Sequence, residues 1–478
     1  MLNHAHYQVS IFDLHNDIDE LTDTNNFNLF KLFDAYIDIF DMIPLSFYKA
    51  YYSSSGTNRD FPLEGMIKAL IFYDLLGLPT INTLIFIINI SSDFRRFLKF
   101  PRAPHKSQFS RFKSNYYSEI YKMFHHLVDF TDDMTTATDE YLASILVTDT
   151  TGFEFYVKEN NPKFYQSILK TSKTYAKLFK KTHPENKTFD IEKYAQSKMP
   201  KFSFSNHDAK LTYLNGHFGY YLKVILSTNG FGLIRDINFY NTDNSLETDL
   251  TPQETKDLFD AKSLIPSLET MFELHPNLYF KYFLGDSGFD AADNYAYLYE
   301  RSITPIICLN PRNKSSLPNT SFTNEGIPLC PNNPNLSMVY TGIIKSDSRA
   351  DRIQYICPKR STQMIDGKKY IILECDNPCT TSLYGRTKNL TVHHNYRYNS
   401  AMPRNSDEWI NLYKLRTVCE RTIAQLKSFI QINISRIHKT LTLKSNILLA
   451  GITQLISFLI LFRSKNTLGP LAIKTLIA

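Results

Sequence analysis

The sequence predicts a mixed α/β domain that follows a helical domain and is interrupted by a β-rich insertion. Apolar residues recur with helical spacing up to about residue 140, and from about residue 144 short apolar runs alternate with helical segments. Between 311 and 400 the helical pattern disappears, while Pro, Asn and Ser become frequent. We therefore expect a helical domain at 1–140, a mixed sheet flanked by helices at 141–310 and 401–478, and the insertion at 311–400.

The composition is that of a folded protein with a small excess of positive charge. The 478 residues are 43% hydrophobic and 21% charged, and 53 Lys and Arg against 47 Asp and Glu give a formal net charge of +6. This balance permits a polyanionic partner without requiring one. The N-terminus lacks the charged and then apolar run of a secretory signal, and six cysteines in a chain of this length indicate a reducing compartment. We expect a cytoplasmic protein.

One segment near the C-terminus is apolar enough to raise the question of a membrane span. The run 447–462 is short for a span and contains Thr453, Gln454 and Ser457. We therefore expect a buried helix there and no membrane association.

The N-terminal domain is predicted to contain two apolar helices and then a basic segment. Pro62 precedes a helix over 65–76, Gly77 and Pro79 end it, and a second helix covers 81–90. Phenylalanines alternate with cations in the next segment, whose basic residues are Arg95, Arg96, Lys99, Arg102, Lys106, Arg111 and Lys113. Such a segment is either the solvated face of a helical domain or a surface that contacts DNA, and composition favours neither.

Short apolar runs define the strands of the α/β domain. The runs 220–227 and 231–240 flank Thr228-Asn229-Gly230, which predicts a hairpin. The other expected elements are strands at 144–148, 278–284 and 304–309 and helices at 251–274 and 291–301. Between the first two strands the segment 158–201 is rich in lysine. Such a run is usually a solvated surface, but in an enzyme acting on nucleic acid it would lie along a duplex.

Two aspartates follow apolar strands, where the loops of an α/β sheet build functional sites. Asp149 comes directly after the run 144–148, and Asp286 follows the strand expected at 278–284. Carboxylates suit two-metal phosphoryl chemistry because Mg²⁺ prefers hard oxygen ligands, and two ions roughly 4 Å apart can activate one oxygen and stabilise another. In that interpretation Asp149 bridges both ions, while Asp286 and Glu420 each complete one. The alternative is three unrelated acids.

Glu420 lies on a helix expected between 406 and 430 that carries an unusual stripe. Tyr413, Arg416, Glu420 and Lys427 are offset by 0, 3, 7 and 14 residues. At roughly 100° per residue these offsets place all four side chains on one face. One acid flanked by two cations and a phenol suits a site that holds a metal ion beside phosphates, since cations and a phenol bind phosphate oxygens without reading sequence.

The spacing Tyr413-x2-Arg416-x3-Glu420-x6-Lys427 resembles the Y-R-E-K signature of bacterial insertion-sequence transposases of the DDE type. The segments 148–151 and 285–290 resemble their first and second aspartate motifs. The run 104–112 resembles part of their helical domain that binds transposon ends, and 384–386 and 403–409 resemble one branch of the family.

This resemblance implies a ribonuclease H-like catalytic domain with Asp149, Asp286 and Glu420 as its acidic triad, binding two ions of Mg²⁺ or Mn²⁺. It implies nicking at transposon ends with water as nucleophile, followed by joining of the freed 3′ hydroxyl to target DNA. Double-stranded DNA is the implied partner, and a bacterial, DNA-associated homodimer the implied assembly. The residues then expected to contact DNA are Tyr413, Arg416, Lys427, Arg386, Arg95, Arg96, Lys106 and Arg111.

Four of the six cysteines fall in the insertion, namely Cys330, Cys357, Cys375 and Cys379. A β-rich segment with little apolar content would gain stability from a structural Zn²⁺ held by four thiolates. Cys375 and Cys379 have an acceptable ligand spacing, but the other separations are longer than in a standard zinc ribbon. Ordinary buried or free thiols are the alternative.

Two questions stay open from the sequence: the role of Trp409 and whether the whole chain is an active enzyme. Trp409, the only tryptophan, either anchors its helix or stacks on an unpaired base, and the anchor is the commoner role. For the whole chain, the alternatives to an active transposase are a catalytically inactive, transposase-derived DNA-binding protein and a hydrolytic nuclease of the same fold. The complete triad and signature favour the transposase.

Overall fold

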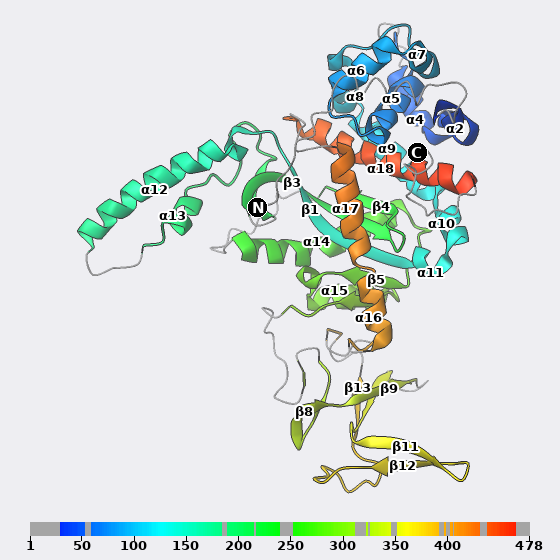
Figure 1. Ribbon diagram of the computed structural model, residues 1–478, viewed down its shortest axis with the longest axis vertical. Helices are drawn as coiled ribbons and strands as arrows, with labels where there is room; N and C mark the ends of the chain where they lie inside the picture. The colour runs from blue at the N-terminus through cyan, green and yellow to red at the C-terminus, as the bar shows by residue number, and fades with distance from the viewer. Residues whose placement is uncertain are drawn as a thin grey trace.

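The computed structural model describes most of the chain, and the ranges that it covers are 29–52, 59–183, 189–214, 217–239, 252–310, 322–323, 326–345, 351–391, 396–397, 402–404, 406–430 and 437–464. A central mixed sheet lies between an N-terminal helical domain and a β-rich insertion, and a helical arm extends to one side (Figure 1).

The N-terminal domain consists of short helices packed around apolar side chains. In chain order these are α2 (Leu29–Tyr36), α3 (Ile39–Met42), α4 (Leu45–Tyr51), α5 (Leu63–Leu75), α6 (Ile81–Ile90), α7 (Ser92–Leu98), α8 (Lys106–Asn115), α9 (Tyr117–Phe130), α10 (Asp132–Thr138) and α11 (Glu140–Ala143). Thr80 and Ser91 accept backbone N–H bonds at the starts of α6 and α7, which satisfies amides that have no partner inside the helix. The two apolar helices expected here are confirmed as α5 and α6.

The central sheet combines antiparallel and parallel strands. Its strands are β1 (Ile145–Glu154), β2 (Lys210–Leu214), β3 (His217–Asn229), β4 (Ile234–Asn238), β5 (Tyr282–Gly285) and β6 (Thr304–Ile307). The order is β2-β3-β1-β5-β6, and β4 also pairs with β3. β1 runs antiparallel to β3 and parallel to β5, and β5 runs parallel to β6. The expected hairpin is confirmed as β3 and β4.

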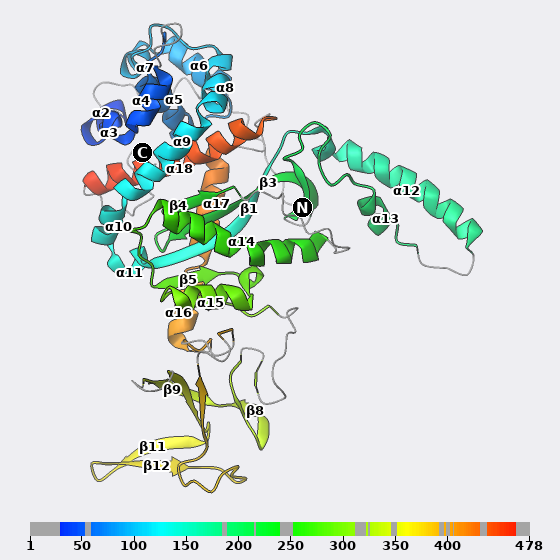
Figure 2. The same cartoon turned by 180° about the vertical axis from the view of Figure 1, so that it is seen from behind.

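Helices cover both faces of this sheet. They are α14 (Pro252–Leu274), α15 (Ala292–Glu300), α16 (Asp407–Lys414), α17 (Thr417–Ile430) and α18 (Thr440–Arg463). α17 crosses the face seen in Figure 1, whereas α14 crosses the opposite face seen in Figure 2. The lysine-rich segment after β1 forms the arm, made of α12 (Pro162–Thr182) and α13 (Ile191–Ser197).

α18 joins the N-terminal domain to the sheet. Ser445 Oγ donates to the carbonyl oxygen of Lys113 at 2.6 Å, and Gln454 Oε1 accepts from the amide of Ile234 on β4 at 3.0 Å. The helix is long and apolar enough to cross a membrane, with mean hydropathy 1.9, but 89% of that apolar window is buried inside the protein. The expectation of a buried C-terminal helix is confirmed.

The described part of the insertion is a set of small sheets. Its strands are β7 (Leu329–Cys330), β8 (Asn333–Ser337), β9 (Val339–Ile344), β10 (Arg352–Ile356), β11 (Arg360–Ile365), β12 (Lys368–Leu373) and β13 (Thr387–Thr391). They pair as β13-β10-β9, β11-β12 and β7-β8. Four buried side chains form a separate small core, namely Ile327, Met338, Ile353 and Tyr355. The expectation of a β-rich insertion is confirmed for these residues.

Two elements differ from the expected boundaries. β1 does not end before Asp149 but continues to Glu154, because Thr150, Thr151 and the buried Phe153 keep pairing with β3. The single helix expected between 406 and 430 is two helices, separated at Leu415 and Arg416. There the backbone makes tighter i→i+3 bonds, such as Val418 N to Leu415 O at 2.9 Å, in place of the α-helical pattern.

Candidate catalytic site

Asp149 lies on β1, and Asp286 directly follows the parallel neighbour β5, where it caps a 3₁₀ turn at Ser287–Phe289. Val147 pairs with Leu284, and each aspartate lies two residues further along its strand direction. Each carboxylate also accepts a nearby backbone N–H at 2.8 Å, Asp149 from Thr150 and Asp286 from Gly288. The parallel register therefore places the two carboxyl groups side by side at one position of the sheet.

The negative charge of Asp286 affects the pKa of Asp149. Burial raises the pKa of Asp149 to about 7, the neighbouring Asp286 adds to this rise, and Glu420 adds a smaller amount. The Thr150 amide and the Arg416 guanidinium act in the opposite direction. Carboxylates that disfavour each other's ionisation are close in space and share a site with little water. Both of the other predicted acids therefore act electrostatically on Asp149.

α17 is held against the sheet by contacts on its buried side. Cys419 is fully buried, and its Sγ donates to the carbonyl oxygen of Leu226 at 3.5 Å. Leu226 is the β3 residue that pairs with Asp149. Three residues further along the helix, Thr422 Oγ1 donates to the carbonyl oxygen of Gly232 at 2.7 Å. Because Glu420 follows Cys419 directly, these contacts bring it beside the aspartates.

The predicted stripe lies around these acids. Arg416 NH1 donates to Glu420 Oε1 at 2.7 Å, and although burial alone would lower the pKa of Arg416, Tyr413, Glu420 and Asp149 raise it. Burial lowers the pKa of Lys427, and the charge of Asp149 opposes that change. Two cations of the stripe therefore interact with Asp149, although the helix break separates Tyr413 from the other three residues.

Tyr413 also belongs to this neighbourhood. Burial and then a hydrogen bond with the Cys308 thiol raise its pKa, Arg416 opposes the rise and Asp286 adds to it. Trp409 stacks on the Tyr413 ring with centroids 4.8 Å apart and is only 6% exposed. This burial supports the role of Trp409 as an anchor for α16 rather than as a platform for a base.

Asp260 on α14 is a fourth acid at the site that sequence reasoning missed. It is 4% exposed, accepts from Thr150 Oγ1 at 3.0 Å and lies 3.8 Å from Lys223 Nζ. A Cβ added at Gly288 would lie 3.3 Å from Asp260 Oδ2 and 2.9 Å from Asp286 Oδ1, so a glycine fits there best. Asp260 thus contacts the segments that carry both aspartates. Its position comes from the packing of α14, for which the sequence holds no motif.

Asp290, the second acid of the segment 285–290, is structural. Its carboxylate is buried and accepts from Arg397 Nε at 2.7 Å, from Arg397 NH2 at 2.5 Å and from the amide of Asn310 at 2.6 Å. Tyr295 donates to the same carboxylate at 3.1 Å and accepts from Arg404 NH2 at 3.0 Å. This network fastens the end of the insertion to the sheet, and Asp286 takes no part in it.

The DNA-contacting residues expected in the N-terminal domain lie apart from the carboxylates, on or beside α7 and α8. Arg95 NH1 donates to the carbonyl oxygens of Ile88 and Asn89, so it closes the end of α6. Arg96 is exposed and pairs with Asp93 at 3.2 Å. Lys106 and Arg111 are exposed on α8.

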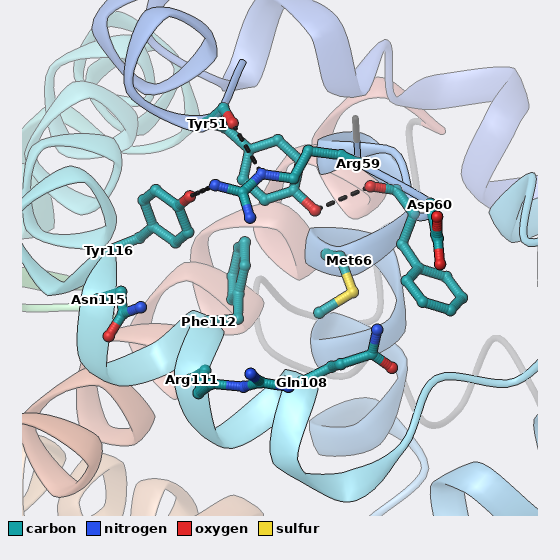
Figure 3. A pocket seen from close by; sticks show the side chains of 10 residues that line it. Tyr51, Arg59, Asp60, Met66, Gln108, Arg111, Phe112, Asn115 and Tyr116 are labelled. Carbon is teal, nitrogen blue, oxygen red and sulfur yellow. Dashed lines mark hydrogen bonds between the residues drawn. The ribbon is translucent and has the colours of Figure 1, made fainter. Parts of the chain in front are cut away.

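Arg111 lines a cavity of about 440 Å³ between α4 and α8. Figure 3 shows Arg59 on its wall, donating to the carbonyl oxygen of Tyr51 at 3.1 Å and to the hydroxyl of Tyr116 at 2.8 Å. Arg111 itself donates to the carbonyl oxygen of Ser107 at 3.3 Å. The cavity is therefore polar on one side, and no residue of the acidic triad reaches it.

The remaining predicted residues lie in the insertion. Burial and then the thiol of Cys330 raise the pKa of Cys379, with a smaller contribution from Cys357, and Arg386 opposes this rise. Among the residues described above, no group of three or more His, Cys, Asp or Glu is arranged to hold a metal ion. Zinc binding by the four cysteines therefore stays a prediction. Arg386 lies beside these cysteines and away from the three acids.

Comparisons with known proteins place the chain in a family. A family model described as Transposase DDE domain matches residues 196–455, over half of the chain, and this range includes Asp286 and Glu420 but begins after Asp149. A model described as Transposase domain (DUF772) matches residues 16–115. No curated protein sequence matches the chain.

Among solved structures, the cryo-EM structure of the piggyBac transposase synaptic complex with hairpin DNA matches 94% of this chain and 77% of its own chain, at 11% identity and a TM-score of 0.36. At this identity and TM-score, the match supports no conclusion about the fold or function of this chain. The family assignment rests on the two sequence matches, and on that basis the chain belongs to the family of transposases with a DDE domain.

Proposed function

We propose that this transposase cuts DNA at the ends of its element with a divalent metal ion as cofactor, and joins the freed 3′ hydroxyl to target DNA. The observation that carries the proposal is the electrostatic effect of Asp286 and Glu420 on Asp149, which the parallel pairing of β1 with β5 and the packing of α17 against the sheet support. An antiparallel hairpin followed by parallel strands supports a ribonuclease H-like sheet. The cation-bearing stripe beside the acids supports the Y-R-E-K assignment.

By their chemistry the three acids suit Mg²⁺ or Mn²⁺, although the described residues contain no group of three such side chains already arranged around an ion. Asp149, Asp286 and Glu420 offer hard oxygen ligands, and the repulsion that raises the pKa of Asp149 is what a bound cation relieves. Glu420 would exchange its bond from Arg416 for the metal, which frees the guanidinium for a phosphate. When bound, two such ions would activate the attacking oxygen and stabilise the leaving one.

The proposed reaction is two successive transfers at phosphorus. Water attacks a phosphodiester at the transposon end, the bond from phosphorus to the 3′ oxygen breaks, and a 3′ hydroxyl and a 5′ phosphate result. That hydroxyl then attacks a target phosphodiester and displaces its 3′ oxygen. Arg416, Lys427 and Tyr413 would donate hydrogen bonds to phosphate oxygens and fix the register of the DNA.

The remaining partners follow from the same proposal. The N-terminal domain would bind the transposon ends through exposed cations of α7 and α8, such as Arg96, Lys106 and Arg111. A homodimer would bring two ends together in the bacterial cytoplasm.

The proposal can be tested with the purified chain, Mg²⁺ and DNA fragments that span both flanks of its reading frame. Nicking at a defined position followed by joining to a second DNA supports it. Binding without cleavage would instead identify an inactive DNA-binding derivative, and cleavage without joining would identify a nuclease.

A further inference from the structure

The arm formed by α12 and α13 projects from the end of β1, the strand that carries Asp149 (Figures 1 and 2). A 3₁₀ turn at Lys158–Asn160 connects strand and helix, and the side chain of Asn161 accepts from the amide of Lys163 to begin α12. At 21 residues α12 is about 31 Å long, taking roughly 1.5 Å per residue. The arm is therefore large enough to contact a partner well beyond the sheet.

Part of the apolar side of α12 packs against the rest of the arm, whereas Tyr175 is 41% exposed and Leu178 is 59% exposed. Tyr175 stacks on Tyr194 of α13 with ring centroids 4.7 Å apart and an interplanar angle of 3°. Phe179 contacts Phe189 at 5.0 Å, and the two fully covered side chains of α12 are Ser172 and Ala176. An amphipathic helix that binds lipid inserts its apolar face. Because α13 and Phe189 cover much of that face here, most of the available surface of α12 is polar, although Leu178 stays exposed.

Six lysines form a stripe on this polar surface, here called the lysine stripe: Lys163, Lys170, Lys173, Lys177, Lys180 and Lys181. At roughly 100° per residue they all fall within about 100° of the helix circumference, and the centre of this stripe lies about 90° from Ala176 and about 130° from Ser172. All six are exposed, and none forms an ion pair with an acid in the described part of the chain. α12 itself contains no Asp or Glu.

The dimensions and chemistry of the lysine stripe match the backbone of a duplex. From Lys163 to Lys181 it extends about 27 Å, or about eight base pairs at roughly 3.4 Å each. Lysine is a point charge that suits phosphate oxygens and does not make the bidentate contacts by which arginine recognises bases. The stripe therefore suits DNA of any sequence.

We propose that the lysine stripe binds the phosphate backbone of double-stranded DNA next to the cleavage site, an inference that rests on the proposed function for its choice of partner. Since α12 follows β1 along the chain after the segment 155–161, DNA bound there would lie against the arm that leaves the end of the strand of Asp149. The stripe would supply affinity without sequence preference and leave recognition of the ends to other residues.

The test uses the full chain and a fluorescein-labelled 30-base-pair duplex of arbitrary sequence, titrated at several salt concentrations. In the triple variant Lys170→Gln, Lys173→Gln, Lys177→Gln, the slope of log affinity against log salt should become shallower by about 2.7, at roughly 0.9 per phosphate contact. The matched control replaces Lys345, Lys368 and Lys369 of the insertion by Gln, which removes the same charge and should leave the slope unchanged. Arginine at the three α12 positions should restore the wild-type slope.

The outcomes separate this inference from the proposed function. Equal slopes for the triple variant and the wild-type protein would overturn the inference, whether or not the protein cuts DNA. Loss of binding to phosphatidylserine vesicles in the triple variant, with duplex binding intact, would overturn it in favour of a lipid surface. An intact circular dichroism spectrum is expected for the triple variant because the replaced side chains are exposed. Absence of cutting by a wild-type protein whose duplex binding depends on the stripe would overturn only the proposed function.

Discussion

Cys419 lies against the carbonyl oxygen of Leu226, the residue that pairs with Asp149 across the sheet. This contact explains how an acid far along the chain reaches the two aspartates. The thiol is small and fully buried, so α17 approaches β3 closely at this point. Burial and the charge of Asp149 both raise the pKa of Cys419, so it stays a neutral donor. The helix is thereby positioned by an uncharged contact, and Glu420 is left for chemistry.

Glu420→Gln should abolish nicking and leave DNA binding nearly unchanged, because the amide removes a negative metal ligand and keeps the shape of the side chain. Glu408→Gln is the matched control, since Glu408 is exposed in the first turn of α16. Gel analysis of end-containing DNA with Mg²⁺ measures the first effect, and fluorescence anisotropy measures the second. Nicking by the Glu420→Gln protein would remove Glu420 from the catalytic role.

Arg416→Ala should weaken binding of transposon-end DNA and reduce its dependence on salt, because a phosphate contact is lost. It should also raise the pKa of Asp149 further, since the Arg416 guanidinium now lowers it. The pH at which cutting reaches half its maximum should therefore move upward. Lys414→Ala, which removes an exposed cation at the end of α16, should change neither property. An unchanged pH profile for Arg416→Ala would argue against its electrostatic contact with Asp149.

Asp149→Asn should stabilise the metal-free protein at neutral and alkaline pH. The pKa of Asp149 is about 7 in the folded protein against an ordinary value of 3.8. Between these values the folded state binds a proton that the unfolded state has lost, so the free energy of unfolding falls as pH rises from about 4 to about 7. The asparagine variant avoids this loss, and its advantage should grow to roughly 2–4 kcal/mol above pH 7 and vanish near pH 4.

Urea denaturation between pH 4 and pH 8 measures this difference. Asp236 is also buried with its pKa raised to about 7, so the pH dependence of the wild-type protein alone would combine two groups. Subtracting the Asp149→Asn curve isolates Asp149. A difference that stays constant with pH would contradict the prediction.

Mg²⁺ should raise the melting temperature of the wild-type protein more at pH 8 than at pH 6, since binding requires the ionised form of Asp149. Asp149→Asn should lose most of this response. Asp293→Asn, which changes an exposed acid on α15, should keep it. Differential scanning fluorimetry at several Mg²⁺ concentrations provides the measurement, and an equal response of wild-type protein and Asp149→Asn would exclude Asp149 as a ligand.

Asp260→Asn should destabilise the fold by about 3 kcal/mol, because the buried Lys223 ammonium loses the negative charge that lies 3.8 Å away. Replacing both residues, as Asp260→Asn with Lys223→Met, should cost less than the sum of the single changes. Urea unfolding of all four proteins gives the coupling energy. Additive effects would show that the 3.8 Å approach contributes little to stability.

Local patterns in the sequence were sufficient for much of the fold. The helices α5 and α6, the β3–β4 hairpin and the alternation of β5, α15 and β6 all follow from apolar spacing and turn residues. The stripe of Tyr413, Arg416, Glu420 and Lys427 is visible because helical periodicity is itself local, although the structure divides it between α16, the break and α17. These are properties of adjacent residues, which is why a single sequence contains them.

Other features depend on contacts between distant segments. β1 continues past Asp149 because β3 is long enough to pair with it as far as Glu154. The break at Arg416 arises where two helices meet the sheet at different points. Asp260 reaches Thr150 only through the packing of α14. Neither the spacing of residues nor the composition predicts these contacts, so they can be seen only in the structure.

The helix α18 holds the N-terminal domain at a fixed position relative to the central sheet. Its Thr453 donates to Asp74 of α5, its Ser445 donates to the Lys113 carbonyl of α8, and its Gln454 bonds both β4 and the Gln425 amide of α17. A rotation of the N-terminal domain against the sheet would break these buried bonds together. We therefore expect a constant number of base pairs between the DNA that the N-terminal helices bind and the scissile phosphate. Inserting or deleting base pairs in that interval should stop cleavage rather than shift it.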